Sequence, residues 1–271
     1  MGSLAGLLYG GSATSAEIES NIANDGYVKS GGMVCLAGSQ DLLEDTIRRS
    51  EANSKYAAVY QELAIKYSRE LASHCPFLLA AAAAGSMTTN GVDIGDDVDL
   101  NLLVEDGTKY VTYLASLLLG LKYSLRYGEA LGNGGLRKLI CVNVVWTRSD
   151  TRPFIRQDDS LAFELMLSEP LVGSDEFRRV LERNRWVERA FPQAFRDRGE
   201  GQSHPPPSVI GRALVTVLAN PRLRAVADKA CRLVAWSIYA AYHWIRRNDG
   251  EAKARLELVK RVKYPYEVFQ D

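Results

Sequence analysis

The residues whose types and spacing could do chemistry are a small turn and two acids that follow it at a fixed distance. Gly85-Ser86 forms the turn, ten residues follow, and Asp97 and Asp99 then flank the apolar Val98. On a strand, side chains at positions i and i+2 share a face, so the two carboxylates should project together. Adjacent carboxylates repel each other unless a cation lies between them, which predicts a site for a divalent metal.

The turn supplies what the ligand of such a metal would need. Glycine lets a backbone approach closely, and a helix beginning near Met87 would direct free N–H groups and the Ser86 hydroxyl at a phosphate. Asp-x-Asp and Gly-Ser pairs also occur as ordinary loop residues. The apolar stretches 76–84 and 98–104 read as strands and favour the functional interpretation, which is phosphoryl or nucleotidyl transfer.

The segment 84–100 resembles the signature of the DNA polymerase beta-type nucleotidyltransferase superfamily. That signature is an apolar residue, Gly, then Gly or Ser, a gap of about ten residues, and then Asp, an apolar residue, Asp or Glu, and an apolar residue. The similarity extends toward a bacterial subgroup with a helical C-terminal domain, and it covers roughly residues 20–195. The further segments that carry it are Asp25-Gly26-Tyr27, Cys141-Val142-Asn143, Ala162-Phe163-Glu164-Leu165, Asn184-Arg185-Trp186-Val187 and Phe191-Pro192.

The resemblance implies an α+β fold with a small mixed nucleotidyltransferase sheet and flanking helices. An N-terminal winged-helix-like element and a C-terminal helical bundle would complete it. We expect a helical and winged-helix-like region over residues 1–75, the nucleotidyltransferase core over 76–152 and a helical domain over 153–271.

Active members of the superfamily place a third carboxylate on a later strand, where this chain offers Asn143 in the strand 139–146. An amide oxygen can bind Mg²⁺ but brings no charge and takes no proton. By analogy with the aminoglycoside nucleotidyltransferases, Glu164 is the candidate base, and a solvent-facing helix acid is the alternative. Arg137 and Lys138 could reach a triphosphate or simply belong to a loop. Trp186 could stack on a base or sugar or serve as a core residue.

Several further elements follow from periodicity. We expect a hairpin at 27–36 after a short helix at 12–24, and a helix over 40–74 with a break near Ala52-Asn53-Ser54. A helix at 109–126 should precede the strand 139–146. After Pro153 the pattern is wholly helical, with helices at 160–167, 174–190, 209–218 and 223–246. The apolar stripe of the last helix predicts either core or a homodimer face.

Composition limits the partners. The 33 basic and 33 acidic residues cancel, which argues against long nucleic acid and favours a small substrate. Four separated cysteines without Cys/His ligand spacing indicate reduced thiols, not structural zinc. No apolar run is long enough for a membrane span and the N-terminus lacks a basic signal region, so we expect a cytoplasmic location.

These observations together predict a Mg²⁺-dependent nucleotidyltransferase that moves NMP from an NTP to a small-molecule acceptor with release of pyrophosphate. Gly85, Ser86, Asn143, Arg137 and Lys138 would bind the nucleotide. Asp97 and Asp99 would hold the metal. Two alternatives stay open, a catalytically degenerate nucleotide-binding module and a nucleotidyltransferase that acts on tRNA or protein.

Overall fold

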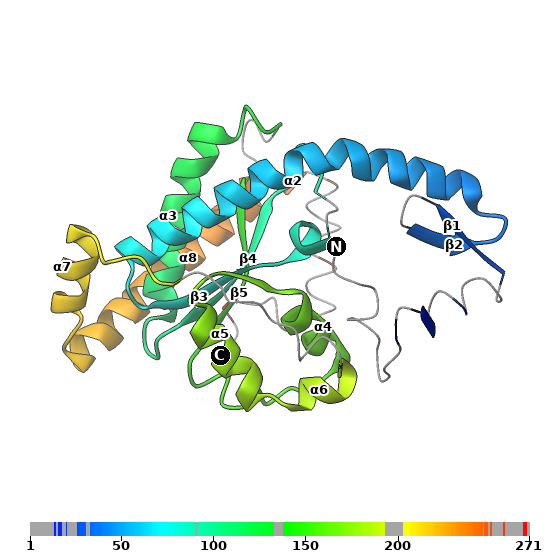
Figure 1. Cartoon of the computed structure of the whole chain (residues 1–271). Helices are drawn as coiled ribbons and strands as arrows, with labels where there is room; N and C mark the ends of the chain where they lie inside the picture. The colour runs from blue at the N-terminus through cyan, green and yellow to red at the C-terminus, as the bar shows by residue number, and fades with distance from the viewer. Residues whose placement is uncertain are drawn as a thin grey trace.

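The chain folds as a mixed α+β structure around one small sheet (Figure 1). The computed structural model describes residues 26–30, 33–89, 92–132, 138–192 and 203–245, with isolated positions toward both ends. The sheet has the strand order β5-β4-β3-β6, in which β3 runs antiparallel to β4 and β6 while β4 and β5 are parallel. Its strands are β3 (Leu78–Ala83), β4 (Val98–Val104), β5 (Ile140–Thr147) and β6 (Glu169–Val172).

Helices lie on both faces of the sheet (Figure 1). On one face α2 (Gln40–His74) and α3 (Lys109–Tyr127) cover the strands, and α8 (Pro221–Ile245) packs against α3. On the other face lie α4 (Asp159–Leu167), α5 (Ser174–Arg183) and α6 (Trp186–Ala190). The short α7 (Val209–Val217) contacts α2. The sequence analysis placed the helices at 159–190 and at 209–245 in one C-terminal domain. In the structure these two groups of helices lie on opposite faces of the sheet.

Strand β4 takes part in two separate hydrophobic clusters. Its even-numbered residues, such as Val98 and Leu100, pack in the cluster beneath α2 and α3. Leu103 packs in the cluster beneath α4, α5 and α6. The predicted alternation of this strand is thus confirmed, and its odd-numbered side chains face the α4–α6 layer.

Three expectations for local structure were wrong. Helix α2 continues through residues 52–54 without a break. None of those three residues is Gly or Pro, and their propensity costs of less than about 0.7 kcal/mol each do not interrupt a helix that packs elsewhere. The segment 174–190 is two helices divided at Asn184, whose buried side chain donates to the Val180 and Thr151 carbonyls and accepts the Phe154 N–H. The sequence analysis did not predict strand β6, which is a short edge strand that contains Pro170 and lies in a region predicted to be helical.

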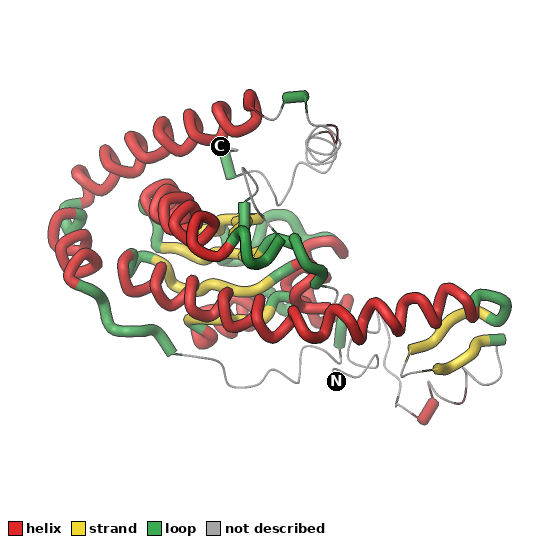
Figure 2. Tube along the Cα trace, turned by 90° about the horizontal axis from the view of Figure 1, so that it is seen from above, coloured by secondary structure: helices red, strands yellow, loops and turns green. Residues whose placement is uncertain are grey.

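The hairpin was predicted correctly, as β1 (Tyr27–Ser30) and β2 (Met33–Leu36) pair antiparallel. Helix α2 links it to the sheet, and the hairpin lies at the far end of that helix (Figure 2). The helix predicted at 12–24 falls mostly outside the described residues, so the winged-helix interpretation stays a prediction.

The apolar stripe expected on the last helix lies largely at the surface. Val226 is 66% exposed, and Val234 and Ile245 are about half exposed, whereas Ala235 on the opposite side is buried. This stripe is therefore not core in the described chain. Within the described part of the chain, no helix combines the length and apolarity that crossing a bilayer requires.

Candidate functional site

The Gly-Ser turn lies directly against the strand that carries the acids. All six residues of β3 are buried alanines or leucines, and the Ala84 N–H donates to the Asp99 carbonyl at 3.0 Å. The segment Gly85–Thr89 then forms a single 3₁₀ turn, η2, where a helix from Met87 onward was expected. So short a turn has a weak dipole, and any anion site here depends on individual N–H groups and not on a helix macrodipole.

Gly85 is required by its conformation and by its neighbour. Its φ of +62° lies in the left-handed region, and a Cβ at this position would stand 2.3 Å from Asp99 Oδ2. Any larger residue would push the carboxylate away. The absent side chain therefore fixes where the Asp99 carboxylate sits beneath the turn.

Asp97, Asp99 and Cys141 come together on one face of the sheet. One carboxylate oxygen of each aspartate and the Cys141 sulfur all lie within 4.8 Å of one another, and all three residues are partly buried. Asp97 and Asp99 begin a row of alternate residues along one face of β4, called the acid row below. The register partner of Asp99 on the parallel strand β5 is Cys141. Burial, then Asp99 and Asp97, raise the pKa of the Cys141 thiol.

Asn143, expected at the third carboxylate position, lies two residues farther along β5. The register shifts here, so that Leu100 pairs with Val142 and Asn101 with Val144. Asn143 is the residue left over between them, and it is half-buried. The strand position beside Asp99 belongs to Cys141, which sequence reasoning missed because the pairing register is not visible in the sequence.

The acidic segment that precedes β4 contacts the Gly-Ser turn. The Ser86 hydroxyl donates to Asp96 Oδ2 at 3.3 Å, and the same oxygen accepts the Asp93 N–H at 3.0 Å. The buried Tyr60 hydroxyl accepts the Gly95 N–H at 3.2 Å. Burial and the nearby carboxylates Asp96, Asp97 and Asp93 raise the pKa of Tyr60. Ser86 is thus held at the site by an acid of the same loop.

Glu164 reaches the sheet through Asn101, the next member of the row on β4. The Asn101 amide donates to Glu164 Oε1 at 2.6 Å and to Ser168 Oγ at 3.1 Å. Asn101 is only 2% exposed, and its Oδ1 has no hydrogen-bond partner within the described structure. The same period of two that identified Asp97 and Asp99 could have pointed to Asn101. Its contact with Glu164, which joins the predicted base to the acid row, could not be foreseen.

Of the two predicted triphosphate contacts, Arg137 lies outside the described residues. Lys138 precedes β5, and its ammonium stands 4.3 Å from the centre of the Tyr242 ring. Its charge also acts on Cys141, where it lowers the thiol pKa against the larger raising effects. Lys138 therefore contributes positive charge near the acid pair.

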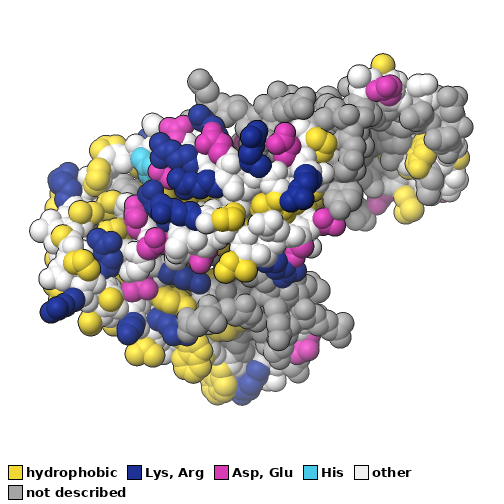
Figure 3. Space-filling view, turned by 90° about the horizontal axis from the view of Figure 1, so that it is seen from below, with side chains coloured by type: hydrophobic (Ala, Val, Ile, Leu, Met, Phe, Trp, Pro, Cys, Tyr) yellow, Lys and Arg dark blue, Asp and Glu magenta, His cyan; other side chains and the backbone are white. Residues whose placement is uncertain are grey.

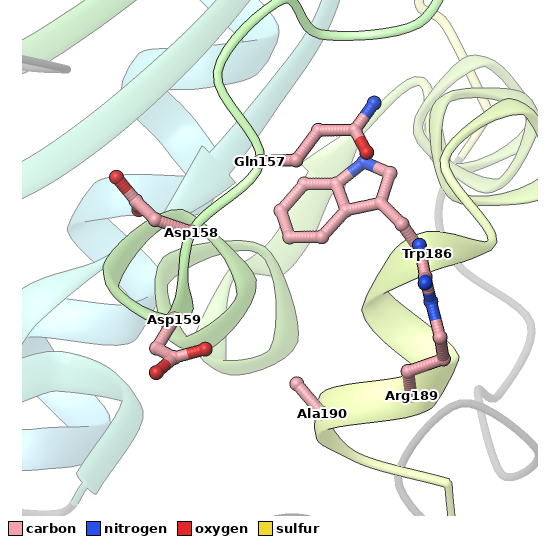
Figure 4. Close-up of a pocket in the computed structure, with 6 residues that line it drawn as sticks. All are labelled: Gln157, Asp158, Asp159, Trp186, Arg189 and Ala190. Atoms are coloured by element: carbon pink, nitrogen blue, oxygen red, sulfur yellow. The ribbon is translucent and has the colours of Figure 1, made fainter.

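A pocket of about 290 Å³ opens between the first turn of α4 and helix α6 (Figure 4). The Gln157 side chain lies beside the Trp186 ring, and Arg189 and Ala190 line the α6 side. The indole N–H donates to the buried Asn184 side chain at 3.1 Å. Trp186 is thus partly buried yet available to the pocket, and α4 connects this pocket to Glu164 about 7.5 Å along its axis.

Charges of both signs are interspersed on the face seen in Figure 3. On α5, Arg178 pairs with Asp175 and Arg179 with Glu176, each across one turn. These exposed pairs resemble a solvated helix surface more than a phosphate-binding track.

The donor set can be compared with what a divalent cation requires. Two carboxylates that face each other, with a glycine in place of a side chain above one of them, suit a divalent cation. The third donor is a sulfur, which Mg²⁺ does not favour. No protein-family description, curated protein or solved structure matched this chain in the comparisons.

Proposed function

We propose that this chain is a metal-dependent nucleotidyltransferase that moves NMP from an NTP to a small-molecule acceptor. The observation that carries the proposal is the meeting of Asp97 and Asp99, with the Asp99 carboxylate directly against the Gly85 turn. A divalent ion bound there would orient the triphosphate and neutralise charge that develops on its oxygens. The resemblance of segment 84–100 to the superfamily signature adds support.

The residues around the pair have separate tasks in this proposal. The Gly85 N–H and the Ser86 hydroxyl would hold phosphate oxygens, with Ser86 exchanging its bond to Asp96 for one to the ligand. Lys138 would add positive charge beside the triphosphate. Holding the nucleotide in one orientation exposes the α-phosphorus to attack from one side, which removes much of the entropic barrier.

The acceptor would enter from the α4–α6 layer. The pocket beside Trp186 has a volume near the lower end of small-ligand pockets, and a sugar or base ring could lie against the indole. As the acceptor oxygen bonds to the α-phosphorus, the bond to the pyrophosphate oxygen breaks. Glu164, held by Asn101, would take the proton of the acceptor hydroxyl.

The experiment is an assay of pyrophosphate release with each NTP, divalent cations and a cell metabolite extract as the acceptor source. We expect Asp97→Asn with Asp99→Asn to abolish release, and the exposed Asp175→Asn to leave it intact. Equal turnover in the double variant would refute the proposal. Mass spectrometry of the products identifies donor and acceptor together.

One observation favours a second function, nucleotide binding without catalysis. The position beside Asp99 is a thiol, Cys141, and not a carboxylate. A site with one charge fewer could retain a nucleotide but fail to stabilise the transition state. Calorimetry that shows NTP binding, combined with no pyrophosphate release from any acceptor, would establish this alternative.

A further inference from the structure

The donor set at the acid row bears on which metal the site selects, a question separate from the reaction. Two oxygens and one sulfur, from Asp97, Asp99 and Cys141, lie within 4.8 Å of one another. Ligand atoms around one zinc ion, with bond lengths of about 2.0–2.3 Å, are separated by about 3–4 Å. Small side-chain rotations would therefore bring all three onto one ion.

A second observation concerns the next polar residue on the same strand. Asn101 follows Asp99 in the same row, is 2% exposed, and leaves its Oδ1 without a partner within the described structure. A buried amide oxygen without a hydrogen bond destabilises the folded state. An ion bound at the acid row would bring water ligands, and one of these could donate to this oxygen.

Mg²⁺ does not match these donors. It takes near-octahedral sets of oxygen ligands and dehydrates reluctantly, whereas thiolate ligands select zinc-like ions. Three protein ligands with one open position are also the usual arrangement of a catalytic zinc. We infer that the Asp97–Asp99–Cys141 site binds Zn²⁺ in preference to Mg²⁺. The inference rests on the metal site of the proposed function but not on the transfer reaction.

Binding is written with its proton. As the zinc–sulfur bond forms, the Cys141 thiol releases one proton to the solvent, and zinc loses water ligands in exchange for the three protein donors. No oxidant or reductant takes part. Cys231, a partly buried thiol on α8, offers a matched control because it lies outside the acid row.

The test uses the full-length chain and metal salts alone. Co²⁺ serves as the spectroscopic stand-in for zinc, because a cobalt–thiolate bond gives a charge-transfer band in the near ultraviolet. We expect this band in the parent chain and in Cys231→Ser, and its loss in Cys141→Ser. Absence of the band from the parent chain, or its loss in Cys231→Ser alone, would overturn the inference.

A second variant keeps the result interpretable if Cys141→Ser folds poorly. Cys141→Asp supplies three carboxylates, and we expect its ratio of Zn²⁺ to Mg²⁺ affinity, measured by calorimetry, to fall at least tenfold. An unchanged ratio would count against a sulfur ligand. A cobalt–thiolate band without pyrophosphate release would keep the zinc site and refute the transferase. If magnesium supports pyrophosphate release and Cys141→Ser does not alter it, the transferase stands and the zinc site is refuted.

Discussion

Replacing Gly85 with alanine tests the contact that places the Asp99 carboxylate. The new Cβ would lie 2.3 Å from Asp99 Oδ2, and ordinary contact begins near 3.4 Å, so the oxygen must move by about 1 Å. The left-handed backbone adds a cost of about 1–2 kcal/mol for any residue with a Cβ. Because the clash falls on the end of a rotatable side chain, it should add little further loss of folding free energy.

Gly107→Ala is the matched control. Gly107 has a similar φ of +75°, but its nearest atom to a new Cβ is Arg224 Cδ at 3.7 Å. Both variants should therefore lose about 1–2 kcal/mol in urea unfolding. Gly85→Ala alone should lose metal affinity and about 100-fold in pyrophosphate release, since a displacement of 1 Å has consequences of that order. Equal metal affinity in the two variants would refute the role of Gly85 in positioning Asp99.

Three further predictions concern residues around the site and the core. Asn184→Ala should lower the unfolding free energy by about 2–4 kcal/mol, because it leaves the Phe154 N–H and other buried groups unpaired; chemical denaturation measures this. Glu164→Gln should reduce kcat about 100-fold with little change in KM for the NTP, as loss of a general base would, and steady-state kinetics separates the two constants. At Glu70 burial acts to raise the pKa, but hydrogen bonds from Lys122 and Tyr123 outweigh it and hold the pKa below 4.5. That stabilisation is present above the unfolded pKa and lost as pH falls through the folded one, so Glu70→Gln should show a smaller loss of stability on acidification in unfolding curves.

Contrary results are specific to each variant. A loss below about 1 kcal/mol in Asn184→Ala would mean that water replaces the amide. A rise in KM with unchanged kcat in Glu164→Gln would assign that carboxylate to binding. If the unfolding free energy of Glu70→Gln falls as steeply on acidification as that of the parent chain, Glu70 does not contribute to the pH dependence of stability.

The strand that carries the acids could be predicted because its residues follow a regular pattern. The strand 98–104 matches β4 residue for residue, and its alternation placed Asp97 and Asp99 on one face as expected. The run of alanines at 80–84 favours helix by propensity, but burial between two neighbouring strands makes it β3. Context outside the segment decided that outcome.

The rest of the site depends on pairings between distant segments. Cys141 enters the acid row only through the register of β4 with β5, and the shift at Asn143 reverses which later residues share that face. The contact of Glu164 with Asn101 joins positions 63 residues apart. Neither relation leaves a local pattern, because a one-residue change of register exchanges the faces of a whole strand.

The two faces of strand β4 differ in role, because one packs in the hydrophobic core and the other carries the residues of the candidate site. Its even-numbered side chains anchor it among the residues beneath α2 and α3, while Asp97, Asp99 and Asn101 occupy the opposite side. Substitutions at Asp97 and Asp99 can therefore change the chemistry of this side while the apolar side chains of the strand keep their packing. If the proposed metal site exists, its selectivity could change in small steps at this strand, in evolution or in the laboratory, while the protein continues to fold.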